Sequence, residues 1–135
     1  MRIVIQFCFA PEPIVAWERA VREAGNRLTV RVGLPGVTSV RSLITYGRAC
    51  GVGSSLRGLS RDGGSLTRLA ATWSPGALVS SLAVHGAADP ETLIEGVHLF
   101  SFGALKKTAR WADAVAGGQF EISKKDGSPK LAKFR

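Results

Sequence analysis

Residues 2–9 decide the fold, and they read Arg2-Ile3-Val4-Ile5-Gln6-Phe7-Cys8-Phe9. Their β-branched and aromatic side chains predict a buried strand, which ends where residues 10–13 bring in two prolines. Because strand side chains alternate, the odd-numbered residues form one wholly apolar face, which we expect helices to cover. The other face carries Val4, Gln6 and Cys8. A buried amide without partners costs about 1–3 kcal/mol, so Gln6 is either hydrogen-bonded inside the fold or available to a ligand.

The length of 135 residues predicts one domain with a hydrophobic core. A complete (β/α)8 barrel uses about 250 residues, so the chain is too short for one. No apolar run approaches the roughly 20 residues of a membrane span. The apolar run after Arg2 is too short for a secretory leader and lacks a cleavage site of small residues. We therefore expect a cytoplasmic protein with no membrane partner.

Cysteine and histidine usage gives no sign of a disulfide framework or a metal site. Cys8 and Cys50 have no CxxC partner, and we expect both to be reduced packing residues. The two histidines, His85 and His98, have no ligand-like spacing to the cysteines, so no metal is expected.

Basic residues are concentrated at the end of the chain. The net charge is +8, and residues 123–135 hold five basic residues against the single acid Asp126. We predict a domain over residues 1–122 and a flexible basic tail over residues 123–135, which either binds an anionic partner or stays solvated. The tail has one aromatic residue, Phe134, and no base-stacking pattern, so we do not expect nucleic acid as a partner.

Strands and helices alternate along the chain. Residues 14–24 predict a helix that packs through Ile14, Trp17, Val21 and Ala24 and ends at Gly25. Residues 28–34 predict a second strand, and Thr38 or Ser39 caps a helix that runs through Cys50. Two strands joined by a helix form a βαβ unit, which implies parallel pairing.

The second half of the chain predicts extra helices before a third strand. Residues 51–64 are rich in glycine and serine but contain neither GxxxxGK[ST] nor GxGxxG, so they indicate a loop more than a phosphate site. Helices are predicted over residues 65–72 and 75–85, and a third strand over residues 96–102. A last helix over residues 104–116 is expected to pack through Leu105, Thr108, Ala109, Ala112 and Val115.

Four short motifs follow one another in a recognisable order: residues 5–9, the Ala24-Gly25 helix end, the 32–35 Val-Gly-Leu-Pro turn and the 97–100 Val-His-Leu-Phe strand. This order resembles the C-terminal part of the methylenetetrahydrofolate reductase family, flavoproteins built on a (β/α)8 barrel. The resemblance spans residues 3 to about 116. It implies an α/β fold that is a partial, or half, TIM-type barrel of about three parallel βα units.

The resemblance also implies roles for individual residues. The family's glutamine on this first strand contacts the folate pterin, which makes Gln6 a substrate ligand. An aromatic residue after the Gly-Leu-Pro turn packs against substrate or nicotinamide, and Tyr46 is its nearest equivalent. Ser42 stands where the family has a second glutamine and Gly103 where it has an asparagine, so those two contacts depart from the pattern.

Placed side by side, the three predicted strands bring Gln6, Arg31 and His98 to one face. We expect Arg31 and His98 to line the cavity, against the alternatives of an ion pair for Arg31 and a hydrogen-bonded core position for His98. In the family, the catalytic acid and most FAD contacts lie on earlier strands, which we expect to lie outside this chain.

Two functions follow from these expectations. In the first, the chain is the C-terminal portion of a methylenetetrahydrofolate reductase-like oxidoreductase of one-carbon metabolism, with FAD, NAD(P)H and a folate-type substrate. Self-association, or a protein that supplies the missing strands, completes the half barrel because its sheet edges are unpaired. In the alternative, the chain is a non-catalytic assembly subunit whose basic tail binds an anionic partner.

Overall fold

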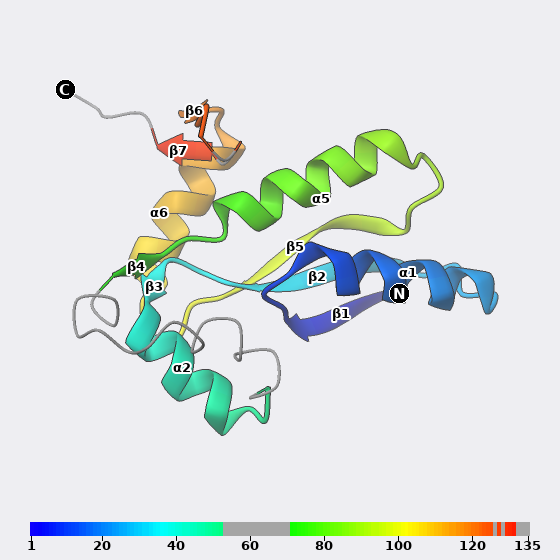
Figure 1. Ribbon diagram of the computed structural model, residues 1–135, viewed down its shortest axis with the longest axis horizontal. Helices are drawn as coiled ribbons and strands as arrows, with labels where there is room; N and C mark the ends of the chain where they lie inside the picture. Colours follow the sequence, from blue (N-terminus) through cyan, green and yellow to red (C-terminus); the bar gives the residue numbers. More distant parts are fainter. Residues whose placement is uncertain (53–70, 126, 128, 132–135) are drawn as a thin grey trace.

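The computed structural model describes residues 1–52, 71–125, 127 and 129–131 (Figure 1). In chain order its elements are β1 (Arg2–Phe7), α1 (Pro11–Glu23), β2 (Thr29–Pro35), β3 (Thr38–Ser39), α2 (Val40–Ala49), β4 (Thr72–Trp73), α5 (Gly76–Ala88), β5 (Ile94–Phe100), α6 (Leu105–Ala116), β6 (Phe120–Ile122) and β7 (Pro129–Leu131).

The central sheet has three parallel strands in the order β1-β2-β5. This confirms the predicted α/β class and the parallel pairing of the three predicted strands. Helix α1 follows β1, helix α2 follows β2, and helix α5 lies between β2 and β5 in the chain. In the part of the chain that the structure describes, no strand pairs with the outer edge of either β1 or β5.

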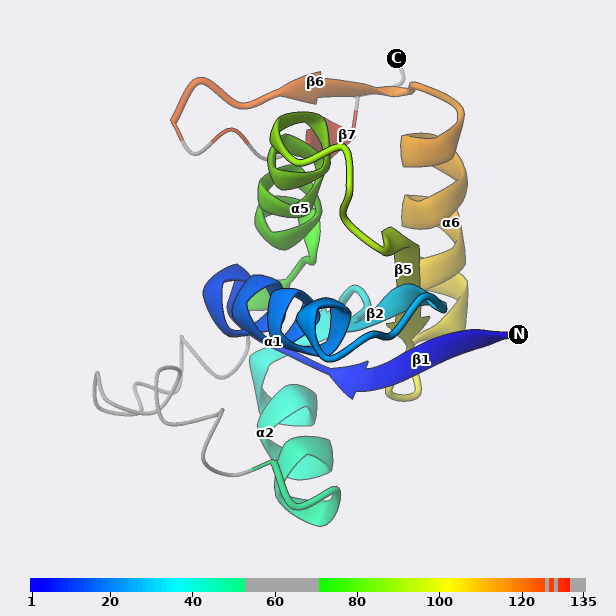
Figure 2. The same ribbon diagram turned by 90° about the vertical axis from the view of Figure 1, so that its right-hand side faces the viewer.

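The hydrophobic core lies on one face of this sheet, under α1 and α5. Val30, Val32 and Leu34 of β2 are completely buried. Because side chains of a strand alternate between its two faces, all three point to the core face. They pack with Ile14, Leu78 and Leu82 of the two helices. Figure 2 shows α1 and α5 side by side above the sheet. Each fully buried aliphatic side chain stabilises the fold by about 1.5–3 kcal/mol, so this layer holds the two helices on the sheet.

A β-bulge in β1 overturns the alternation predicted for residues 2–9. The strand ends at Phe7 rather than Phe9, and its register shifts between Val4 and Phe7. Phe7 therefore stands opposite Gly33 and contacts Phe100, on the face away from the core. Cys8, predicted for that face, packs against the core instead. The sequence pattern could not show this, because one extra residue in a strand reverses the faces of all that follow.

Helix α1 packs through the predicted Ile14, but its buried face is rotated relative to the predicted one. Glu18, expected on the outer face, is only 1% exposed, whereas Trp17 is 38% exposed. The Glu18 carboxylate accepts a hydrogen bond from the Leu93 backbone N–H at 3.0 Å and pairs with Arg22 at 3.3 Å. These bonds satisfy the backbone just before β5, so the helix turns this acid inward.

Helix α6 packs through the predicted Thr108, but its buried face is rotated toward Trp111 and Ala114. Leu105 is 70% exposed, and the buried residues are Thr108, Trp111 and Ala114. Gly36, at the end of β2, explains the rotation: a Cβ atom there would come within 2.6 Å of the Thr108 methyl carbon. The absent side chain leaves space for Thr108, which fixes which side of the helix faces the sheet.

The structure tests some of the predictions for the segments between the main strands and helices. The helix predicted from Ser39 is confirmed, and the Ser39 hydroxyl caps it by accepting the Ser42 N–H at 3.1 Å. Of the helix predicted over residues 65–72, residues 65–70 lie outside the described residues, and Thr72 belongs to β4, which pairs with β3. Most of the glycine- and serine-rich stretch also lies outside them. Strand β7 lies within the segment predicted as a tail and pairs with β6, which precedes that segment.

None of the described helices combines the length and the apolar character that crossing a bilayer requires.

Candidate functional site

We call the side of the central sheet away from the core the open face, because many of its side chains are exposed. It carries residues from all three strands: Arg2, Val4, Gln6, Phe7, Thr29, Arg31, Gly33, Glu95, His98 and Phe100. Val4 is 51% exposed there. Parallel sheets occur almost only with both faces covered, so a face with exposed side chains on such a sheet is unusual and marks a surface for binding.

One carboxylate organises the charged end of the open face. Glu95 lies at a register shift in β5 and pairs with Arg2 at 2.9 Å and Arg31 at 3.3 Å. A hydrogen bond with Thr29 lowers the pKa of Glu95, and the bond with Arg31 and the charges of Arg31 and Arg2 lower it further. Arg31 therefore forms an ion pair, which is one of the two roles predicted for it. Its side chain remains 45% exposed on the open face.

Aromatic side chains gather at the opposite, carboxyl end of the three strands. The Phe7 ring lies 5.5 Å from the ring of Phe100 and 4.9 Å from that of Phe102, both edge-on. Phe7 is nevertheless only 3% exposed, because its neighbours surround it. Offset and edge-to-face pairs of this kind add about 0.5–1.5 kcal/mol each beyond their buried area. We call Phe7, Phe100, Phe102 and Tyr46 the aromatic cluster.

Tyr46 is the exposed member of the aromatic cluster. It comes from α2 and stacks on Phe102 with ring centroids 5.2 Å apart and an angle of 21° between the planes. Phe102 has a positive φ of 46° and Gly103 a φ of 80°, so the backbone makes a tight left-handed turn directly after β5. This turn presents Phe102 to Tyr46, whose ring is 43% exposed and free to contact a flat ligand on its outer side.

The structure places three of the four predicted site residues on the open face and the fourth at its end. Gln6 lies in the β1 bulge and is exposed. Its amide therefore needs no hydrogen-bond partner inside the protein. His98 pairs in register with Gly33, and its exposed ring lies 4.8 Å from that of Phe100. Arg31 lies two residues before Gly33, the register partner of His98, and is therefore closer to the charged end of the open face. Tyr46 joins through Phe102.

A groove runs along the free outer edge of β1. It has a volume of about 390 Å³ and is lined by Ile5, Gln6, Phe7, Cys8, Pro13, Ile14 and Trp17. Most of these residues are apolar, and Trp17 contributes its half-exposed ring from α1. A strand with an unpaired edge beside an apolar groove is a typical place for further chain to add.

Sequence reasoning missed Glu95 and Phe7 as members of the site. Both lie at register shifts, which turn their side chains to the open face. The available signal was Gly33: glycine in a strand interior often marks a bulge or a close backbone approach.

The open face carries the exposed side chains of Gln6 and His98, and the exposed Tyr46 lies at its carboxyl end. Glu95 is the one carboxylate on β1, β2 and β5. It forms ion pairs with Arg2 and Arg31 and is not a free acid. No model of a known protein family matches this chain.

Proposed function

We propose that this chain supplies the carboxyl-terminal strands of a methylenetetrahydrofolate reductase-like oxidoreductase, with the open face lining the interior of a (β/α)8 barrel. The observation that carries this proposal is a parallel sheet whose core face is covered by α1 and α5 and whose other face carries exposed polar residues. Barrel interiors are filled by side chains from all eight strands, so the open face needs strands beyond those of the described residues.

Self-association or a partner protein supplies those strands. The free edge of β1, with its apolar groove and the exposed Trp17, offers a place where a strand and its helix add. The added strands shield Val4 and bring further side chains toward Arg31 and Gln6. In this arrangement FAD and NAD(P)H are bound by the completed barrel rather than by this chain alone.

A folate-type ring fits the carboxyl end of the open face. Active sites of such barrels lie at the carboxyl ends of the strands, where Gln6, His98 and Tyr46 are found. The Gln6 amide pairs with the donor and acceptor edge of a pterin, and Tyr46 covers its face. Arg31 and His98 line the cavity. The order of the sequence motifs in residues 3 to 116 supports the same substrate class.

The test of this function is ligand uptake by the full chain, alone and with a candidate partner. We expect the completed assembly, formed by self-association or with the partner, to bind FAD with its visible absorbance band and then to bind folic acid. The Gln6→Ala variant should bind folic acid roughly five- to tenfold more weakly, since one hydrogen bond contributes about 1 kcal/mol. The matched control is Gln119→Ala, which removes an exposed amide between α6 and β6. Equal affinities for the two variants would contradict the proposed site.

A non-catalytic assembly subunit is the second candidate, and Glu95 favours it. On β1, β2 and β5 this is the only carboxylate, and its two arginine partners keep it ionised. A general acid must carry a proton to deliver, so these strands offer none. In this case the basic segment with the exposed Lys124 and Lys125 reaches an anionic partner. Colourless protein that takes up no added FAD yet associates through the open face would select this candidate.

A further inference from the structure

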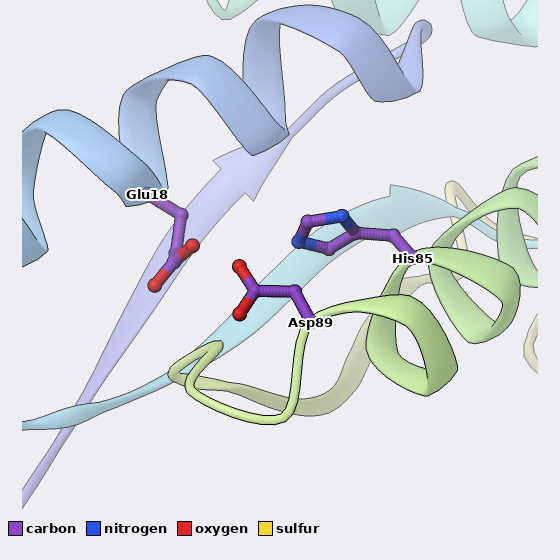
Figure 3. A group of neighbouring side chains, drawn as sticks. All are labelled: Glu18, His85 and Asp89. Atoms are coloured by element: carbon purple, nitrogen blue, oxygen red, sulfur yellow. The ribbon is translucent and has the colours of Figure 1, made fainter.

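Three potential metal ligands meet on the helix side of the sheet, away from the open face. Glu18 comes from α1, His85 from the last turn of α5, and Asp89 from the residue that ends α5. One ligand atom from each lies within 4.8 Å of the others. Figure 3 shows the two carboxylates and the imidazole ring turned toward one another between the two helices. His85 and Asp89 are four residues apart, a spacing that places both on one side of a helix end.

Two buried atoms of this group lack partners among the described residues. They are the Glu18 Oε2 oxygen and the His85 Nε2 nitrogen. Glu18 itself is 1% exposed, so bulk solvent does not satisfy this oxygen. Leaving a buried polar atom unpaired costs about 1–3 kcal/mol, and more for a charged group. Orphan atoms on two neighbouring side chains, both able to bind metal, indicate a ligand between them.

The remaining atoms of the group are already fixed by the protein. Glu18 Oε1 accepts the Leu93 N–H at 3.0 Å and pairs with Arg22 Nε at 3.3 Å. Arg22 also donates to Asp89 Oδ2 at 2.8 Å and, more weakly, to Oδ1 at 3.4 Å. Outer hydrogen bonds of this kind orient metal ligands and are as important as the ligands themselves. They leave Glu18 Oε2 as the carboxylate oxygen without a partner among the described residues.

We propose that Glu18, His85 and Asp89 bind a zinc ion that joins α1 to the carboxyl end of α5. Two carboxylates and one imidazole are a ligand set that zinc accepts, and three protein ligands leave its fourth position for water. Zinc bonds of about 2.0–2.2 Å space tetrahedral ligands by about 3.4 Å, so the side chains need to approach by no more than about 1.4 Å. The Arg22 guanidinium repels every divalent cation alike, so the imidazole nitrogen of His85, which suits zinc better than magnesium or calcium, selects the metal.

This site is independent of the proposed function, since it lies across the sheet from the open face and involves neither Gln6 nor Tyr46. Its role is structural: it satisfies the two orphan atoms and ties the segment before β5 to the first helix. Metal that binds the folded chain more tightly than the unfolded chain raises the unfolding temperature. Zinc removal should therefore lower the Tm of the whole chain.

The experiment titrates the full chain with zinc chloride and follows binding by calorimetry and by Tm. We expect one zinc ion per chain and a higher Tm. Glu18→Gln and His85→Asn should each weaken zinc binding by at least about tenfold. Matched controls are Glu12→Gln, an exposed acid on the same helix, and His98→Asn on the open face, and both should bind as the natural chain does. Comparing each variant with and without zinc keeps the result readable if a substitution lowers the Tm by itself.

A second measurement on the natural chain needs no variant. Zinc should shift the imidazole proton resonances of His85 and leave those of His98 in place. Cobalt in place of zinc should give the visible spectrum of nitrogen and oxygen ligands, without the strong sulfur band that Cys50 would produce. The proposal is overturned if zinc does not bind, if the variants and their controls bind equally, or if His98 shifts instead of His85.

Discussion

The backbone of Gly33 lies so close to Ile5 that a Cβ atom on Gly33 would sit 2.2 Å from the Ile5 carbonyl oxygen. It would also lie 2.8 Å from the carbonyl oxygen of Gln6. This close approach accommodates the β1 bulge, which sends Phe7 to the open face and Cys8 to the core. The bulge therefore determines which side chains are available to a ligand.

Replacing Gly33 by alanine should destabilise the chain. The new methyl group meets backbone atoms that cannot move aside alone, and overpacking of this kind costs about 1–3 kcal/mol. The matched control is Gly96→Ala in β5, where a Cβ atom meets nothing within 4 Å, and it should change the stability by less than about 0.5 kcal/mol. Urea unfolding of both variants measures the difference. Equal midpoints would show that the bulge does not depend on Gly33.

Phe7 should be the most sensitive position of β1. Its ring is 3% exposed and contacts Phe9, Phe100 and Phe102, so Phe7→Ala should lower the free energy of unfolding by about 3–5 kcal/mol. Val4→Ala, on the same strand but half exposed, should cost far less in the monomer. Denaturant unfolding at low protein concentration provides the comparison. A small effect of Phe7→Ala would mean that the aromatic cluster is not packed as described.

The ion pairs of Glu95 should make stability depend on pH in the acid range. Its pKa in the folded state is lowered from the ordinary 4.5 by Thr29, Arg31 and Arg2. The stabilisation is therefore complete above that ordinary value and is lost as the pH falls through the lower, folded-state pKa. Nuclear magnetic resonance should show Glu95 titrating below 4.5. Glu95→Gln should lose less stability between neutral and acid pH than the natural chain, and an unchanged profile would contradict the role given to these pairs.

The two cysteines should differ in reactivity. Burial raises the pKa of the Cys8 thiol, which lowers its thiolate fraction at mildly alkaline pH. Cys50 is exposed, so the packing role predicted for it is wrong. Brief treatment with iodoacetamide followed by peptide mass analysis should find the label on Cys50 before Cys8. Unfolding in urea should remove the difference. Faster labelling of Cys8 in the folded chain would place it on the open face, as its alternation from Val4 predicts, and would argue against the bulge.

The sequence predicts the parallel sheet well because each strand carries its own signal. Val30, Val32 and Leu34 alternate with polar or small residues, and the helices between strands imply parallel pairing. The same alternation places Gln6, Arg31 and His98 on one face, as the structure has them. These are properties of nearest neighbours in the chain.

What the sequence does not predict depends on contacts between distant segments. The inward turn of Glu18 is set by Leu93, 75 residues away, and the rotation of α6 by Gly36. The position of Glu95 between two arginines follows from a register shift, which no single strand encodes by itself. Hydrophobic spacing in α1 favours Trp17 as a packing residue, but a buried acid with a backbone partner takes its place.

The central claim is that the open face is the inside of an incomplete barrel that other strands cover. Light scattering of the isolated chain at micromolar concentration tests it most directly, with Val4→Lys as the variant that puts a charge on that face. We predict assemblies larger than the 14.3 kDa monomer, which Val4→Lys breaks up without unfolding the chain. A stable 14.3 kDa monomer throughout this range, unaffected by Val4→Lys and associating with no candidate partner, would contradict the claim.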